Sequence, residues 1–244
     1  MITTPARLIG LGVGPGDPDL LTVKAVRFIE AADVIAHFCK AGNASQARRA
    51  AERYIRPDAI EVSLGYPVTR EIPKQDPRYG LQIGEFYDSA AQVLASHLDM
   101  GRLVVVLSEG DPLFYGSYMH LHVRLAAAYK TEVIPGITSL SGCWSQAGVP
   151  IAQGEDVLSI VPGMLPEDEL EQRLYGCDAI VLIKIGAHLA KVRRVLNRCG
   201  RMAGAIYVER GTMPEAKCIP LERFKEPEAP YFALVLVPGW AGRR

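Results

Sequence analysis

The sequence lacks an excess of charge of either sign, because 27 lysines and arginines are balanced by 27 aspartates and glutamates. A balanced charge gives no electrostatic argument for a nucleic-acid partner or a membrane surface, and we expect neither. No apolar run approaches the ~20 residues of a membrane-spanning helix. Residues 1–5 also lack the features of a secretory signal. We therefore expect a cytoplasmic protein.

Cysteine is scarce as well. The five cysteines are scattered, and no two of them form a Cys-x-x-Cys pair. Zinc sites usually use closely spaced cysteine pairs, so we expect no metal site, and in a cytoplasmic protein we expect the thiols to be reduced. The chain is long enough, at 244 residues, to form two domains of ordinary size.

The centre of the chain is Leu103–Leu107, five branched aliphatic residues in succession, followed by the polar segment Ser108–Asp111. Such a run is typical of a strand buried on both faces in the middle of a parallel sheet. The spacing of Met119, Val123 and Ala126 predicts a helix after the polar segment. A turn between that strand and that helix lies at the carboxyl end of the sheet, where open α/β sheets bind ligands.

A similar unit begins the chain, with a strand at Leu8–Val13, a turn at Gly14–Asp19 and a helix that starts near Thr22. Its glycines suggest a dinucleotide site, but their spacing is one residue short of that motif. Asp17 also lies where a pyrophosphate needs free backbone N–H groups without a nearby negative charge. The turn therefore favours a ligand that is cationic or rich in hydrogen-bond donors, and a tight turn without a ligand is the alternative.

A third unit of this kind is Glu132–Ser139, in which Thr138 or Ser139 caps a helix of small residues. Between the first two units we expect a basic surface helix at residues 45–54. Residues 65–80 are expected to form a long loop, and a helix at 83–100 to end at Gly101. The break at residues 148–150 predicts a domain boundary, with one domain at 1–149 and another at 150–244.

The second half repeats the alternation of strand and helix. We expect strands near residues 157–161, 179–183, 203–208 and 231–237, and helices from 167 and over 187–198. The predicted fold is therefore two α/β domains. We expect the breaks that close these strands to face the turns of the first half across a cleft, which is the usual place for a small-molecule site.

Three motifs occur in an order that resembles the tetrapyrrole methylase family: Gly12–Thr22, Gly110–Pro112 and Pro135–Ser139. Within that family, the branch that methylates precorrin-2 at carbon 20 is similar at Ser108–Tyr118, Val161–Gly163 and Tyr207–Thr212. The resemblance extends over essentially the whole chain. It implies two α/β domains, usually in a homodimer, with S-adenosylmethionine (SAM) bound in the cleft between the domains.

The resemblance also implies roles for single residues. Those that match SAM-binding positions are Pro15, Glu109, Gly110, Asp111, Phe114, Thr138, Ser139, Lys184 and Gly211. Two of them depart from the relatives that methylate uroporphyrinogen, since Glu109 replaces a glycine and Lys184 replaces a frequent methionine. The resemblance implies a reduced tetrapyrrole with many carboxylates as the acceptor, and no metal cofactor.

SAM carries a methyl group that is already activated, so we expect the protein chiefly to hold donor and acceptor in line. The candidates for a base are Glu109, Tyr115 and His120, and also His37 and His122, and the sequence does not rank them. The candidates for binding the tetrapyrrole carboxylates are Arg70, Lys74 and Arg78 in the long loop, for which a solvated loop is the alternative.

The activity implied is SAM-dependent methylation of precorrin-2 at carbon 20, which gives precorrin-3A in cobalamin synthesis. One alternative is the same methylation on the cobalt-loaded substrate, cobalt-factor II, or another methylation of the corrin ring. A second is a nucleotide-binding regulatory module without enzyme activity. Asp17, Glu109 and Asp111 argue against such a module, because carboxylates repel phosphates.

Overall fold

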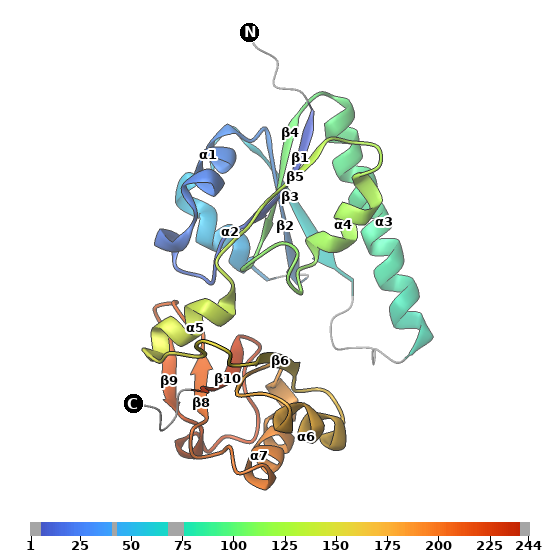
Figure 1. Cartoon of the computed structure of the whole chain (residues 1–244). Helices are drawn as coiled ribbons and strands as arrows, with labels where there is room; N and C mark the ends of the chain where they lie inside the picture. Colours follow the sequence, from blue (N-terminus) through green and yellow to red (C-terminus); the bar gives the residue numbers. More distant parts are fainter. Residues whose placement is uncertain (1–5, 41–42, 68–75, 240–244) are drawn as a thin grey trace. The chain divides into compact units, whose positions relative to one another are not determined.

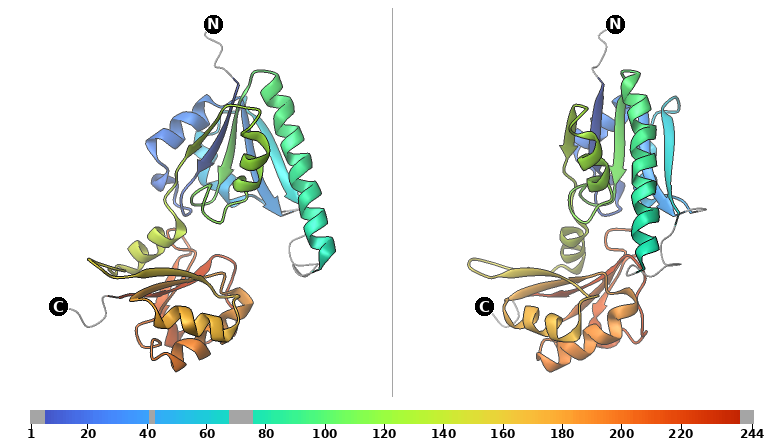
Figure 2. Two further views of the ribbon diagram at one scale, coloured as in Figure 1. Left: turned by 45° about the vertical axis from the view of Figure 1, so that its right-hand side comes forward. Right: turned by 90° about the vertical axis from the view of Figure 1, so that its right-hand side faces the viewer.

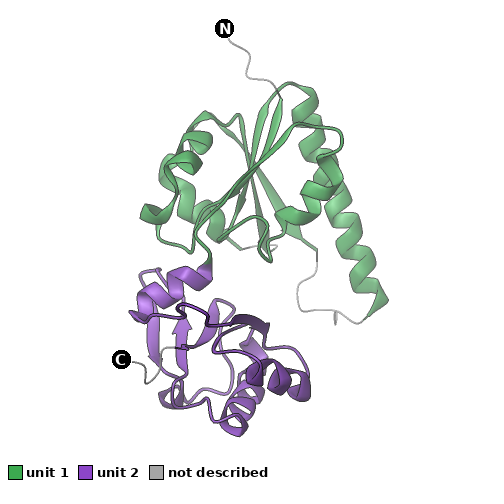
Figure 3. Cartoon of the chain, viewed as in Figure 1, with its two compact units in different colours: residues 1–138 green, residues 139–244 purple. Residues whose placement is uncertain are grey.

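A computed structural model describes residues 6–40, 43–67 and 76–239 of the chain. The chain divides into two compact units, residues 1–138 and 139–244 (Figure 3). The helix α5 (Ser139–Ala147) is grouped with the second unit, where its Cys143 packs against Gly211. Our expected boundary lies after this helix rather than before it, and the assignment of domains stays a prediction.

The first unit is built on a parallel five-stranded sheet with the order β3-β2-β4-β1-β5 (Figure 1). Its strands are β1 (Arg7–Gly12), β2 (Val34–Lys40), β3 (Ile60–Tyr66), β4 (Leu103–Ser108) and β5 (Thr131–Ile134). The strand predicted to be central is β4, which lies between β2 and β1 with every residue buried. That prediction is confirmed.

Helices cover both faces of this sheet (Figure 2). They are α1 (Val23–Ala31) and α2 (Gln46–Ala51) on one face, and α3 (Pro77–Asp99) and α4 (Tyr118–Leu125) on the other. Val105 and Leu107 of β4 pack toward α1 and α2, whereas Val104 and Val106 pack toward α3 and α4. Because both faces of β4 are covered, its sequence is an unbroken aliphatic run instead of an alternation.

The helix α3 begins earlier than predicted. Asp76 accepts a hydrogen bond from the backbone N–H of Arg78 at 2.9 Å, and Pro77 takes the first helical position. An aspartate cap followed by proline is a start signal for a helix, so the prediction of a loop at Arg78 is wrong. At the other end of the expected loop, β3 extends to Tyr66. Arg70 and Lys74 lie outside the described residues.

The helix predicted after the polar segment is α4, but the residues whose spacing predicted it do not form its buried face. Val123 is 73% exposed, and the buried residues are Tyr118, Leu121 and Leu125. The ring of Tyr118 lies over Gly10 of β1, so closely that a Cβ on Gly10 would be 2.6 Å from Cδ1 of the ring and closer still to two other ring atoms. The ring of Tyr118 therefore fills the space left by the missing side chain of Gly10. The spacing of apolar residues along a helix does not predict such a contact between distant residues.

The second unit contains a mixed five-stranded sheet with the order β6-β7-β10-β8-β9. Its elements are β6 (Leu158–Pro162), α6 (Glu167–Tyr175), β7 (Ala179–Ile183), α7 (Leu189–Arg198), β8 (Ile206–Glu209), β9 (Lys217–Pro220) and β10 (Ala233–Val237). The strands β6 and β7 are parallel, and the other described pairs are antiparallel. We did not predict β9, whose four residues carry little hydrophobic pattern.

Short 3-10 turns complete the description, at Pro18–Leu20, Glu52–Tyr54, Gly186–His188 and Leu221–Arg223. Both units are thus α/β, as predicted. Among the described residues, no helix combines the length and the apolar character needed to cross a bilayer.

The fit of Tyr118 over Gly10 can be tested by substitution. Gly10→Ala would force the ring of Tyr118 out of its place, so we expect the free energy of unfolding to fall by about 2–3 kcal/mol. Gly84→Ala in α3 is the matched control, because its Cβ would meet nothing within 4 Å. We expect that control to stabilise the protein by about 0.5–1 kcal/mol. Urea unfolding measures both, and a Gly10→Ala variant as stable as the wild type would contradict this packing.

Candidate functional site

Three turns of the first unit meet at the carboxyl ends of the neighbouring strands β4, β1 and β5. The backbone N–H of Gly110 donates to the carbonyl of Gly14 at 2.8 Å, and the N–H of Gly14 donates back at 3.3 Å. A Cβ on Gly136 would be 2.8 Å from Cα of Gly12 and would clash with the carbonyl oxygen of Gly110. The three turns therefore approach so closely that glycine is required at their contact.

The position of these turns in the sheet is one where ligands bind. The helices that follow β1 and β4 pack on opposite faces, so the two turns leave the sheet in opposite directions. Open α/β sheets bind ligands at such a point. The turns at residues 12–17, 108–116 and 135–139 carry three carboxylates and no lysine or arginine. Their chemistry suits a cationic or donor-rich ligand rather than a phosphate.

Asp111 links two of the turns. Its Oδ1 accepts from the backbone N–H of Leu113 at 2.9 Å, and its Oδ2 accepts from that of Gly136 at 3.2 Å. The carboxylate thus holds the turn after β4 against the turn after β5. Each oxygen of a carboxylate has room for a second hydrogen bond, so Asp111 can still accept one from a ligand.

Glu109 precedes this link and has no hydrogen bond or ion pair within the described residues. Desolvation by the surrounding protein raises the pKa of the Glu109 carboxyl to about 7, although the side chain is exposed to solvent. Contact with solvent favours the charged form of the carboxyl and so offsets part of this desolvation. Glu109 is therefore a solvent-facing acid that is free to meet a ligand.

The other candidates for a base lie apart from one another. Tyr115 is 50% exposed in the turn after β4, where its ring meets the edge of Phe114. His120 lies on α4 and stacks on Tyr87 of α3, with ring centroids 4.2 Å apart. Burial, and then the charge of Arg124, lower the pKa of His120. His122 shares a hydrogen bond with the hydroxyl of Tyr118 at 3.2 Å.

Left-handed backbone occurs at four non-glycine residues of the described chain: Tyr115 (φ 55°), Lys184 (φ 54°), Arg210 (φ 48°) and Thr212 (φ 69°). This conformation costs about 1–2 kcal/mol for each residue with a Cβ. All four lie at or beside residues to which the family resemblance gives a role, namely Phe114, Lys184 and Gly211. Strain of this kind concentrates at functional sites. Sequence reasoning missed Arg210 and Thr212, because no residue pattern marks a left-handed arginine or threonine.

The end of β8 carries two of these residues, and Gly211 between them is closely packed. A Cβ on Gly211 would be 2.6 Å from Sγ of Cys143. Beside it, the hydroxyl of Tyr207 donates to Oε2 of Glu209 at 2.8 Å. Oγ1 of Thr212 is buried and has no hydrogen-bond partner among the described residues. Buried hydroxyls in native proteins normally have a hydrogen-bond partner, and a bound ligand can supply the partner that Thr212 lacks among the described residues.

Thr138 and Ser139, also implied to bind SAM, are the last residue of the first unit and the first residue of the second. Pro15 follows the bridge between Gly14 and Gly110 directly. Arg78, expected to bind the tetrapyrrole, pairs with Asp76 at 2.6 Å on an exposed surface. Within the described part of the chain, no group of three or more His, Cys, Asp or Glu side chains is placed to hold a metal ion.

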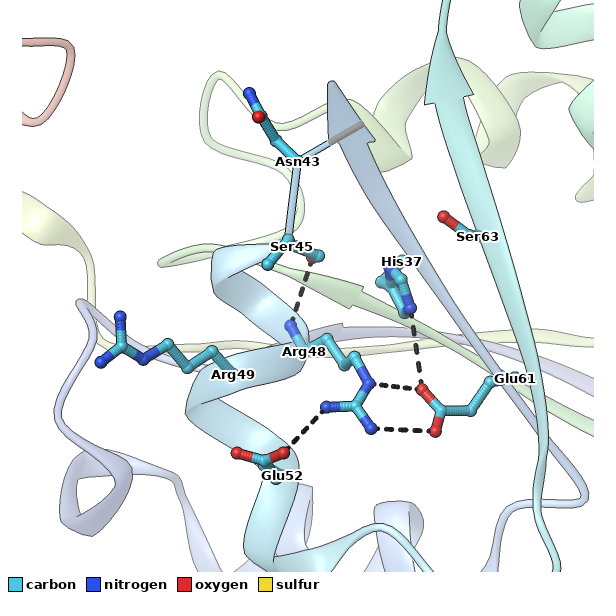
Figure 4. Close-up of a pocket in the computed structure, with 9 residues that line it drawn as sticks. His37, Asn43, Ser45, Arg48, Arg49, Glu52, Glu61 and Ser63 are labelled. Atoms are coloured by element: carbon cyan, nitrogen blue, oxygen red, sulfur yellow. Dashed lines mark hydrogen bonds and ion pairs between the residues drawn. The ribbon is translucent and has the colours of Figure 1, made fainter. Parts of the chain in front are cut away.

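A separate polar hollow lies beside β2, α2 and β3 (Figure 4). Arg48 binds both carboxylate oxygens of Glu61, at 2.6 and 3.0 Å, and Oε1 of Glu52 at 3.1 Å. Nε2 of His37 lies 3.8 Å from Glu61, and burial is the main cause that lowers the pKa of His37. The paired charges of Arg48, Glu52 and Glu61 hold α2 to the sheet, and Nδ1 of His37 is buried without a hydrogen-bond partner among the described residues.

The strain at Lys184 predicts an unusual stabilising substitution. Lys184→Gly removes the Cβ from a left-handed position, so we expect its free energy of unfolding to exceed that of Lys184→Ala by about 0.5–1 kcal/mol after the greater entropy of glycine in the unfolded chain is counted. Lys184→Ala is the control, since it removes the same atoms beyond the Cβ but keeps the Cβ itself. Urea unfolding of both variants makes the comparison, and equal stabilities would rule out backbone strain at this position.

Comparison with known proteins gives the site its context. The chain matches the model of the Tetrapyrrole (Corrin/Porphyrin) Methylases over residues 7–224. It is 56% identical over 237 residues to a precorrin-2 C(20)-methyltransferase of Sinorhizobium sp, with 97% of each chain covered. A cobalt-precorrin-2 C(20)-methyltransferase of Salmonella typhimurium is 25% identical, with 95% of each chain covered.

Among solved structures, the uroporphyrin-III C-methyltransferase of Thermus thermophilus complexed with S-adenyl homocysteine has a TM-score of 0.65 at 25% identity. The match covers 94% of this chain and 96% of that one. The resemblance read from the three glycine motifs is thus confirmed, and the chain belongs to the tetrapyrrole (corrin/porphyrin) methylase family.

Proposed function

We propose that this protein transfers a methyl group from SAM to carbon 20 of precorrin-2, giving precorrin-3A in cobalamin synthesis. The observation that carries this proposal is the 56% identity, over 97% of both chains, to the Sinorhizobium precorrin-2 C(20)-methyltransferase. The acidic glycine turns of the first unit support it, because their chemistry suits the donor. We also propose that the protein is a homodimer and that it is cytoplasmic.

The residues present fit SAM. SAM supplies a methyl group on a positively charged sulfonium, so the protein needs no covalent intermediate. The turns offer Glu109 and Asp111 to a cationic ligand with hydroxyl and amine donors, and the turns themselves carry no lysine or arginine. Two buried hydroxyls, of Ser108 and Thr212, have no partner among the described residues. The proposed contacts are Pro15, Glu109, Gly110, Asp111, Phe114, Thr138, Ser139, Lys184 and Gly211.

Glu109 is the base that the geometry favours. It lies in the turn after β4, is exposed and is without a partner in the described chain. A carboxylate in contact with water can take up a proton and pass it to solvent. Tyr115 lies in the same turn, whereas His120 is stacked on Tyr87. We therefore rank Glu109 first, then Tyr115, and His120 last.

We further propose that Arg70, Lys74 and Arg78 receive carboxylates of the tetrapyrrole. Guanidinium groups bind carboxylates in a bidentate geometry, and lysine binds them as a point charge. Arg78 already pairs with Asp76 across an exposed surface. Exposed pairs are weak, so a carboxylate of the substrate can compete for this arginine.

The two alternative functions are methylation of the cobalt-loaded substrate and nucleotide binding without enzyme activity. The cobalt-loaded substrate is supported by the Salmonella relative, but that relative is 25% identical, against 56% for the Sinorhizobium relative named for precorrin-2. A nucleotide-binding module without enzyme activity is disfavoured by the carboxylates in the turns. The metal-free substrate is therefore the better choice.

Incubation with methyl-labelled SAM and precorrin-2, with and without inserted cobalt, tests the function. We expect the label at carbon 20, located by NMR, and faster transfer to the metal-free substrate. A Glu109→Gln variant should transfer more slowly if the proposed base is correct. Transfer to a different carbon, or faster transfer to the cobalt-loaded substrate, would assign the protein to another member of the family.

The donor site makes a separate prediction about affinity. Asp111→Ala removes the link between two turns together with a ligand acceptor, so we expect the Kd for S-adenosylhomocysteine to rise about 10-fold or more. Asp19→Ala is the matched control, because Asp19 pairs with Arg53 on an exposed surface and should change that Kd less than about 2-fold. Calorimetry measures both, and equal effects would show that the site lies elsewhere.

A further inference from the structure

Ser117, the residue that precedes α4, makes a hydrogen bond that its position does not predict. A serine there usually accepts a hydrogen bond from a backbone N–H of the first helical turn. Here the side chain of Ser117 makes no such capping bond, and its Oγ instead shares a hydrogen bond with the hydroxyl of Tyr66. The serine therefore holds the end of β3, a distant part of the chain, rather than its own helix.

The ring of Tyr66 is fixed by other aromatic residues. It stacks on Phe38 of β2 with ring centroids 5.6 Å apart and an interplanar angle of 18°. Phe86 and Tyr87 of α3 lie against it, at 5.0 and 6.5 Å between centroids. Aromatic contacts of this kind restrict the ring. The ring contacts thus hold the hydroxyl of Tyr66 against Ser117.

The segment between Asp111 and Ser117 needs support at both ends. At one end, Asp111 is bound to the backbone of Gly136. In between, Tyr115 has a left-handed backbone, and Gly116 is so tightly packed that a Cβ would be 2.8 Å from the carbonyl oxygen of Pro112. A strained backbone persists where its surroundings hold it in place. The bond between Tyr66 and Ser117 supplies that hold at the second end.

We infer that Tyr66 is a positioning residue for the turn at residues 109–117, and through that turn for the binding of SAM. The inference rests on the proposed function, since it concerns the donor site of the same enzyme. Tyr66 acts through Ser117, which joins the turn to α4. Removing its hydroxyl leaves the aromatic packing intact and frees the far end of the turn.

Substitution of the hydroxyl tests this inference. Tyr66→Phe should raise the Kd for S-adenosylhomocysteine about 3- to 10-fold, the effect of one neutral hydrogen bond. It should raise the KM for SAM by a similar factor and leave kcat at saturating SAM nearly unchanged. Ser117→Ala should have the same effect, and the double variant should bind no more weakly than either single variant, because both changes break the bond between Tyr66 and Ser117.

Tyr129→Phe is the matched control. Tyr129 is also half-buried, and its hydroxyl donates to Oδ1 of Asp99 at 2.8 Å. It therefore also loses a tyrosine hydrogen bond to a distant side chain, but one that involves none of residues 109–117. We expect the Kd of Tyr129→Phe to equal that of the wild type.

The outcomes separate this inference from the proposed function. A wild-type protein that does not bind S-adenosylhomocysteine overturns the proposed function and the inference with it. A wild-type protein that binds, together with a Tyr66→Phe variant that binds equally well or with additive effects in the double variant, overturns the inference alone.

Discussion

The close approach of three backbone turns is the constraint on which the first unit depends. The carbonyl of Gly110 lies where a side chain on Gly12 or Gly136 would be, so the turns after β1, β4 and β5 form one contact made of backbone. This brings the carboxylates of Glu109 and Asp111 to the edge of the sheet without basic neighbours in the same turns. The chemistry of the proposed donor site follows from that contact.

Such a contact is unfavourable in isolation, because glycine loses more conformational freedom on folding than any other residue. The sheet offsets this cost by burying β4 on both faces between two pairs of helices. The same support allows Tyr115 to keep a left-handed backbone. The second unit repeats the arrangement on a mixed sheet, with Lys184 after β7 and Arg210 and Thr212 after β8. In both units a well-packed sheet holds strained residues at strand ends, the places that the family resemblance gives to ligand binding.

Much of the architecture could be predicted from the sequence. The aliphatic run at residues 103–107 indicates a central parallel strand, since a strand covered on both faces has apolar side chains in succession. The glycine motifs indicate the family, because turns that approach this closely have no room for a Cβ and so require glycine at their contacts. Where prediction failed, a local signal was weak or ignored. The pair Asp76 and Pro77 announces the start of α3, and β9 is too short and polar to carry a strand pattern.

The sequence by itself determined most of the segments that form strands and helices, which turns carry glycine and carboxylate, and which family the chain resembles. These properties depend on residues that are neighbours in the chain. The tertiary structure decided which face of α4 is buried, that Tyr118 lies over Gly10, that Gly211 packs on Cys143, and that Ser117 binds Tyr66. Each of these depends on residues far apart in the chain, and neither periodicity nor local propensity specifies which distant side chains will meet.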